Sequence, residues 1–307
     1  MIPRNNTKYM TTKKQNKNLH DAKRNKNDEF YTGMTDIEKE LSHYKNHFEG
    51  KTVLCNCDDP SSSNFVRYFA LNFEQIRLKR IISTHYENDK PSYWIEINHK
   101  VKSIEEIEDL PKLSLKENGD FRSNESVAFL KQSDIVVTNP PFSLFREYMS
   151  QLIQYDKKFL IIGSFNAITY KDVFNLIKDN LVWLGYNSVK EFTTPGGQIQ
   201  KFGNIIWYTN LTHKKRNEEI ILFRNYYGNE EDYPMYDNHA VIEVSKVVNI
   251  PKDYMNVMGV PITFLDKYNP DQFKILGIAN NVRWIGYECQ TIIDGREIYN
   301  RILIVRQ

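Results

Sequence analysis

The sequence contains few cysteines, and their number and spacing exclude two kinds of scaffold. The 307 residues include three cysteines, Cys55, Cys57 and Cys289. An odd number argues against a disulfide framework, and a single Cys-x-Cys pair supplies too few ligands for a structural zinc site. We therefore expect three reduced thiols and no structural metal.

Long apolar stretches are also missing. No run approaches the ~20 residues that a membrane-spanning helix needs, and the first residues lack the apolar segment of a signal peptide. These absences predict a cytoplasmic protein. The apolar and charged content is otherwise that of a globular chain long enough to bury one large core or two modest ones.

The excess of positive charge is small, a formal +2 for the whole chain. This value does not by itself indicate a nucleic-acid-binding protein, so a site for a polyanion must come from local clustering. In residues 1–27 a single acid, Asp21, is surrounded by the basic residues Arg4, Lys8, Lys13, Lys14, Lys17, Lys23, Arg24 and Lys26. We predict a flexible basic arm there, which either lies along phosphates or is a solvated tail.

Hydrophobic patterning divides the remainder near Arg224. In residues 28–224 short apolar strands alternate with amphipathic helices, which is the pattern of an α/β fold with a doubly wound, mostly parallel sheet. Strands are expected at 52–57, 80–84, 93–97, 134–138, 158–163 and 181–185, and helices at 36–48, 64–73, 126–132, 145–155 and 170–180. Residues 225–307 form a C-terminal region with strands near 274–277, 282–287 and 298–305.

The tetrapeptide Asn139-Pro140-Pro141-Phe142 directly follows the expected strand at 134–138. Ligands of open α/β sheets bind at the carboxyl ends of the strands, which places the tetrapeptide where chemistry occurs. The Asn139 side-chain oxygen and the Pro140 carbonyl can accept both hydrogens of a planar amino group, while Phe142 offers an aromatic face. Such a cradle suits an extruded adenine. The competing interpretation is an ordinary turn that ends a strand.

A glycine-rich phosphate-binding turn is absent after the expected strand at 52–57, and Cys57-Asp58-Asp59 stands in its place. Two carboxylates would repel a pyrophosphate but can pair with a cationic cofactor that has no phosphate. S-adenosylmethionine, with its ammonium and sulfonium groups, fits that description. The alternative is that Asp58 and Asp59 cap the helix that begins near Asn64, and the two roles are compatible.

Two other short segments carry acids beside aromatic residues. Asp28-Glu29-Phe30-Tyr31-Thr32 precedes the first helix and either folds against the same pocket or acts as a hydrophobic staple. In Gly119-Asp120-Phe121-Arg122, Asp120 can accept a hydrogen bond from the amino group of an adenine while Phe121 packs on the purine. Gly-Asp is also a common turn, so this second segment is a weaker indication.

Taken in order, these segments resemble the EcoRI-type adenine-specific DNA methyltransferases. The resemblance runs from about Asp28 to the C-terminus and is most distinctive at 55–60 and 259–270. It implies an S-adenosylmethionine-dependent methyltransferase fold with a C-terminal DNA-recognition region, and methyl transfer to N6 of a flipped adenine in double-stranded DNA. It also implies the catalytic residues Asn139, Pro140, Pro141 and Phe142, and the cofactor-binding residues Phe30, Tyr31, Thr32, Cys57, Asp58, Asp59, Asp120, Phe121 and Asn139.

Other interpretations of the residues stay open. The same cradle would serve an amine of RNA or a protein glutamine, and a chain of this fold could also bind DNA without turnover. We expect a monomer, with a cognate restriction endonuclease as a possible partner. Segments 196–201 and 214–216 are candidate DNA contacts, and after the expected strand at 80–84 only Glu87 offers an acid for the ribose, at some distance.

Overall fold

The structure is a computed structural model that describes residues 31–88, 91–193, 198–279 and 290–307. The expected basic arm at 1–27, Phe30 and the expected strand at 282–287 lie outside the described residues. Within the described residues, no helix is long and apolar enough to cross a bilayer.

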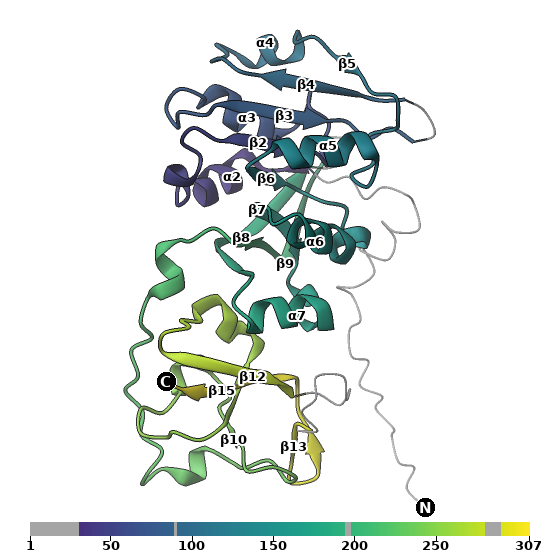
Figure 1. Ribbon diagram of the computed structural model, residues 1–307. Coiled ribbons are helices and arrows are strands. Elements are labelled where there is room, and N and C mark those ends of the chain that lie inside the picture. Colours follow the sequence, from purple (N-terminus) through teal and green to yellow (C-terminus); the bar gives the residue numbers. More distant parts are fainter. Residues whose placement is uncertain (1–30, 89–90, 194–197, 280–289) are drawn as a thin grey trace, which may run out of the picture.

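A large sheet forms the centre of the molecule, with the strand order β1-β8-β9-β7-β6-β2-β3-β4-β5 (Figure 1). The central strands β7, β6, β2 and β3 run parallel, and the remaining neighbours pair antiparallel. The bounds are β1 (Tyr31–Thr32), β2 (Thr52–Cys55), β3 (Arg80–Thr84), β4 (Tyr93–Ile97), β5 (Leu113–Ser114), β6 (Ile135–Thr138), β7 (Lys158–Ser164), β8 (Trp183–Thr193) and β9 (Ile199–Thr209).

The prediction of a mostly parallel sheet is therefore wrong at both edges. A parallel neighbour needs a long crossover, usually a helix, and only two connections between adjacent strands provide one. They lead from β2 to β3 through α3 (Asn64–Leu71) and from β6 to β7 through α6 (Phe145–Gln154). β4 follows β3 without a helix, and β9 follows β8 as the second arm of a long hairpin, so each turns back antiparallel.

Helices cover both faces of the sheet, as a doubly wound fold requires. On one face, α2 (Met34–Leu41) and α3 share a buried cluster with β2, in which Ile37 and Phe65 accompany Val53. On the other face lie α5 (Asn124–Gln132), α6 and α7 (Lys171–Lys178), whose buried residues belong to a second cluster that includes Leu54 of β2. A short α4 (Ile104–Glu108) lies near the far edge.

The expected helix at 36–48 is shorter than predicted. It ends at Leu41, and a 3-10 turn, η1 (Lys45–His47), follows it. The Ser42 hydroxyl donates to the Lys39 carbonyl at 2.7 Å, which competes with the helical hydrogen bonds at this point. The apolar side chains that follow the end of α2 remain buried. The helical spacing of apolar residues that predicted a longer helix therefore records burial of these side chains and not helical backbone.

The C-terminal region is built on a smaller sheet with the order β10-β11-β15-β12 and a separate β13-β14 hairpin. Its core is continuous with the face of the large sheet that carries α7, since Phe174, Phe264 and Phe273 belong to one buried cluster. Figure 1 shows this region beside α7. The bounds are β10 (Ile242–Glu243), β11 (Met258–Pro261), β12 (Phe273–Ala279), β13 (Ile292–Ile293), β14 (Arg296–Glu297) and β15 (Arg301–Arg306), with 3-10 turns η6 (Val247–Asn249) and η7 (Ile262–Lys267).

Candidate active site

The chain order of the parallel strands creates a switch point between β2 and β6. From β2 the chain proceeds to β3 on one side and later returns to β6 on the other, and such reversals are where open α/β sheets bind ligands. The loops that follow the two strands contact each other here. The Cys57 N–H donates to the Thr138 hydroxyl at 3.2 Å, and the Tyr148 hydroxyl of α6 donates to the Asn56 side-chain oxygen. The acidic turn and the Asn-Pro-Pro-Phe tetrapeptide therefore lie side by side.

The tetrapeptide leaves β6 as a rigid, partly covered loop. Asn139 is 7% exposed and Pro140 is buried, while Pro141 and Phe142 are partly exposed. Pro141 (φ −55°) precedes the 3-10 turn η2 (Phe142–Leu144), which leads directly into α6. The Phe142 ring is held edge-to-face by Phe192 of β8, with ring centroids 6.4 Å apart. This contact fixes one side of the ring and leaves part of it accessible.

In the acidic turn, Asp59 is oriented by groups that the sequence did not indicate. Its Oδ1 accepts from the Tyr93 hydroxyl at 2.6 Å and from the Ser61 N–H and hydroxyl at 2.9 and 2.8 Å. Burial alone would raise the pKa of Asp59, but these bonds outweigh it, and the pKa lies below its ordinary value. The carboxylate stays ionised and fixed.

The competing role for these aspartates, capping of α3, falls to another residue. Ser63 is the N-cap, and its hydroxyl oxygen accepts from the Val66 N–H at 3.4 Å. The same hydroxyl donates to Asp58 Oδ2 at 3.4 Å. Neighbouring Cys57 is partly exposed, and burial of its sulfur raises the pKa of the thiol far above the usual range. Charge in this turn therefore comes from the two aspartates.

The Gly119–Arg122 segment lies against the chain that follows β3. Gly119 has φ +80°, and a Cβ there would lie 1.9 Å from the His85 carbonyl oxygen, so only glycine fits. The same His85 packs on Tyr93, with ring centroids 5.0 Å apart, and Tyr93 holds Asp59. Asp120 therefore belongs to the same edge of the sheet as the acidic turn.

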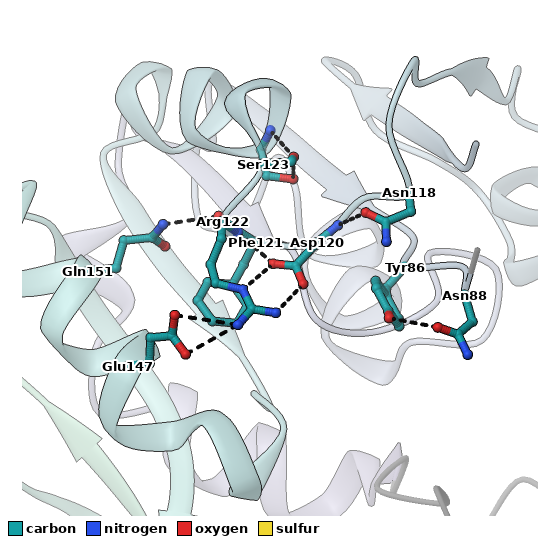
Figure 2. A network of polar contacts seen from close by, with 10 residues as sticks. Tyr86, Asn88, Asn118, Asp120, Phe121, Arg122, Ser123, Glu147 and Gln151 are labelled. Atoms are coloured by element: carbon teal, nitrogen blue, oxygen red, sulfur yellow. Dashed lines mark hydrogen bonds and ion pairs between the residues drawn. The ribbon is translucent and has the colours of Figure 1, made fainter. Parts of the chain in front are cut away.

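Arg122 occupies both oxygens of Asp120, as Figure 2 shows. The distances are 2.8 Å from Nε to Oδ1 and 2.6 Å from Nη2 to Oδ2, and Nη1 lies 3.3 Å from Glu147 Oε2 on α6. The Arg122 guanidinium holds the pKa of Asp120 below its ordinary value. Phe121 is 5% exposed and packs edge-to-face with Tyr148, so only a small part of its ring is accessible.

The strand β1 brings Thr32 to the same place. Thr32 pairs with Phe192 of β8, the residue that holds Phe142, and its carbonyl accepts from the Asn64 side chain at 2.8 Å. The Thr32 hydroxyl is buried without a hydrogen-bond partner among the described residues. Tyr31 shares β1 with Thr32.

The basic segment 214–216, a candidate phosphate patch, is only partly exposed. Arg216 is 8% exposed and lies between the rings of Trp183 and Tyr268, at 4.9 and 5.0 Å. Lys215 pairs with Asp266 at 2.6 Å, which leaves Lys214 as the exposed cation of the three. The interpretation as a phosphate patch is thus wrong for Arg216, which joins the sheet to the C-terminal region. Of the other candidate segment, 196–201, residues 196 and 197 lie outside the described residues.

Sequence comparison places the chain in a family. It belongs to the family described as adenine-specific methyltransferase EcoRI, whose sequence model matches residues 18–305. The chain is 47% identical to the type II methyltransferase M.EcoRI of Escherichia coli, over 94% of this chain and 96% of that protein. It is 38% identical to the type II methyltransferases M.MgeORF184P of Mycoplasma genitalium and M.MpnI of Mycoplasma pneumoniae, each over 85% of this chain and 86% and 85% of those proteins. No solved structure matches the chain.

Proposed function

We propose that this protein transfers a methyl group from S-adenosylmethionine to N6 of an adenine within a specific sequence of double-stranded DNA. The observation that carries the proposal is the position of Asn139 and Pro140 at the switch point, beside the acidic turn. Membership of an adenine-specific methyltransferase family supports the same substrate atom.

The residues around the switch point fit S-adenosylmethionine. The cofactor supplies an electrophilic methyl group on a sulfonium. Asp58 and Asp59 form an anionic turn that suits its ammonium group and disfavours a phosphate. Asp120 would accept from the amino group of the cofactor's adenine with acceptor capacity that Arg122 leaves unused, and the buried Thr32 hydroxyl is available for a ligand hydrogen bond.

The tetrapeptide needs to position the adenine amino group without removing a proton first. The lone pair of that nitrogen is delocalised into the purine ring. When the Asn139 side-chain oxygen and the Pro140 carbonyl accept both N–H hydrogens, the nitrogen becomes pyramidal and its lone pair is directed outward. The same oxygens stabilise the positive charge that develops on nitrogen, so catalysis consists of positioning and electrostatics. Phe142 stacks on the base and offsets part of the few kcal/mol that extrusion costs.

The assay is transfer of labelled methyl to unmethylated duplex DNA, followed by nucleoside analysis. We expect Asn139→Ala to abolish transfer while calorimetry still detects S-adenosylmethionine binding, because the amide acts on the acceptor. Asn98→Ala, at an exposed position after β4, is the matched control and should retain wild-type activity. Near-normal turnover by Asn139→Ala would refute the assigned role.

Phe142→Ala tests stacking separately. We expect residual activity with weaker capture of the target base, and the defect should shrink when the target adenine is mismatched, since extrusion then costs less. The measurement is the ratio of methylation rates on matched and mismatched duplexes. An identical ratio for variant and wild type would count against stacking.

A further inference from the structure

A second concave surface lies between the antiparallel part of the sheet and the C-terminal region. This cleft has a volume of about 820 Å³. One wall comes from β8, β9 and the turn after β7, and the other from residues 245–248 and from the turn η7. The volume is that of a small-ligand site, so the cleft can hold a short segment of a polymer but not a whole duplex.

One end of the cleft's lining lies at the same edge of the sheet as the tetrapeptide. Phe165, which immediately follows β7, lines it, and β7 is the parallel neighbour of β6. Thr138 pairs with Ile161, so β7 continues for only three residues beyond the end of β6. With ~3.3 Å per residue and ~4.8 Å between strands, Phe165 lies roughly 10 Å from the start of the tetrapeptide.

The charge of the cleft is positive. Its charged lining residues are Lys215, Lys246, Lys267 and Asp266, which gives three cations against one anion and a formal charge of +2. Lys215 and Asp266 pair at 2.6 Å, from opposite walls, and neutralise each other. The excess charge therefore rests on Lys246 and Lys267, which are both exposed.

Contacts with α2 and with His43, which follows it, hold the part of β8 that lines the cleft. The register of β8 against β9 shifts between Leu184 and Ser188, so the intervening bulge leaves the ladder. The carboxylate of Glu40 on α2 accepts from the N–H groups of Tyr186 and Asn187, at 2.7 Å each. His43 stacks on Tyr186 with ring centroids 3.6 Å apart and an angle of 10°. The bulge residues that line the cleft are thus held in place and have little freedom to lose on binding.

We propose that this cleft receives the sugar-phosphate backbone of the DNA next to the target adenine. Lys246 and Lys267 contact phosphates, and the bulge at 185–187 lies against the same DNA strand. The inference rests on the proposed function, because that function supplies the polyanion. The inference adds to that function the protein surface and the residues that hold the DNA strand.

The test is the salt dependence of duplex binding by a Lys246→Gln/Lys267→Gln variant. Each neutralised phosphate contributes ~0.9 to the slope of log K against log salt, so the slope should become shallower by about 2. The control variant is Lys51→Gln/Lys79→Gln, two exposed lysines before β2 and β3 at the opposite edge of the sheet. Its slope should match that of the wild type, and both variants should bind S-adenosylmethionine normally.

The outcomes separate the two proposals. A shallower slope in the cleft variant alone supports the cleft as the DNA surface. If wild-type protein methylates DNA and the cleft variant keeps the wild-type slope, the cleft assignment is overturned while the proposed function stands. If the wild type neither binds duplex DNA nor transfers methyl to it, both fail.

Discussion

Replacing Glu40 by glutamine tests whether a buried carboxylate holds the bulge of β8. Glu40 is 0% exposed. Its Oε1 accepts from the Tyr44 hydroxyl at 2.8 Å and the Tyr186 N–H at 2.7 Å, and its Oε2 accepts from the Asn187 N–H at 2.7 Å and side chain at 3.1 Å. Burial raises the pKa of Glu40, and these hydrogen bonds oppose the rise. Three of the four partners are N–H groups, which can only donate, and they favour the ionised carboxylate against the effect of burial.

The cost of the substitution follows from this donor set. Glutamine has one acceptor oxygen and one NH2 group. In the less costly orientation the NH2 replaces Oε1, where the Tyr44 hydroxyl can turn to accept but the Tyr186 N–H loses its acceptor. An unsatisfied buried donor costs ~1–3 kcal/mol, and the remaining bonds weaken because the charge is gone. Glutamine is neutral and avoids the cost of burying a charge, which offsets part of this loss. We therefore expect the free energy of unfolding to fall by about 2–3 kcal/mol.

Urea unfolding followed by tryptophan fluorescence and circular dichroism measures the effect. Glu38→Gln is the matched control, because Glu38 is exposed on the same helix and its replacement should change stability by no more than ~0.5 kcal/mol. If Glu40→Gln unfolds at the same urea concentration as this control, the carboxylate does not hold the bulge and the reasoning is refuted.

Two further predictions concern the acidic turn and a buried histidine. Tyr93→Phe removes the 2.6 Å bond to Asp59. A bond to a charged group contributes ~1.5–3 kcal/mol, so we expect the affinity for S-adenosylmethionine to fall roughly ten- to hundredfold, and an unchanged calorimetric Kd would contradict this. Burial lowers the pKa of His213 to about 4, whereas the unfolded chain takes up a proton near pH ~6.5. Stability should therefore fall by about 2 kcal/mol as pH drops from ~6.5 to ~4, after allowance for screening. His213→Gln should flatten that part of the stability curve, and a curve as steep as that of the wild type would argue against the assignment.

Much of the fold could be predicted from local patterns. The strands β2, β3, β6 and β7 and the helices α3 and α6 lie where runs of apolar residues and helical periodicity place them. These signals depend on neighbours within a few residues, which hydrophobic patterning records. The placement of the tetrapeptide and of the acidic turn at carboxyl ends of strands follows from the same alternation, whereas the pairing of β2 with β6 is known only from the structure.

The sequence-based predictions fail where contacts between distant segments determine strand direction or burial. The strands at both edges pair antiparallel because of how their connections fold back, and periodicity carries no information on strand direction. Arg216 was predicted from its basic neighbours to lie at the surface, yet it is buried between Trp183 and Tyr268, two rings remote in sequence.

The sequence by itself indicated most of the strands and helices around the parallel part of the sheet and the family to which the chain belongs. Only the tertiary structure decided which groups orient the acidic turn and the bulge of β8. Tyr93 reaches Asp59 across 34 residues and Glu40 reaches Tyr186 across 146. Such contacts form because sheet pairing and core packing bring remote segments together, and no short-range pattern in the chain specifies them.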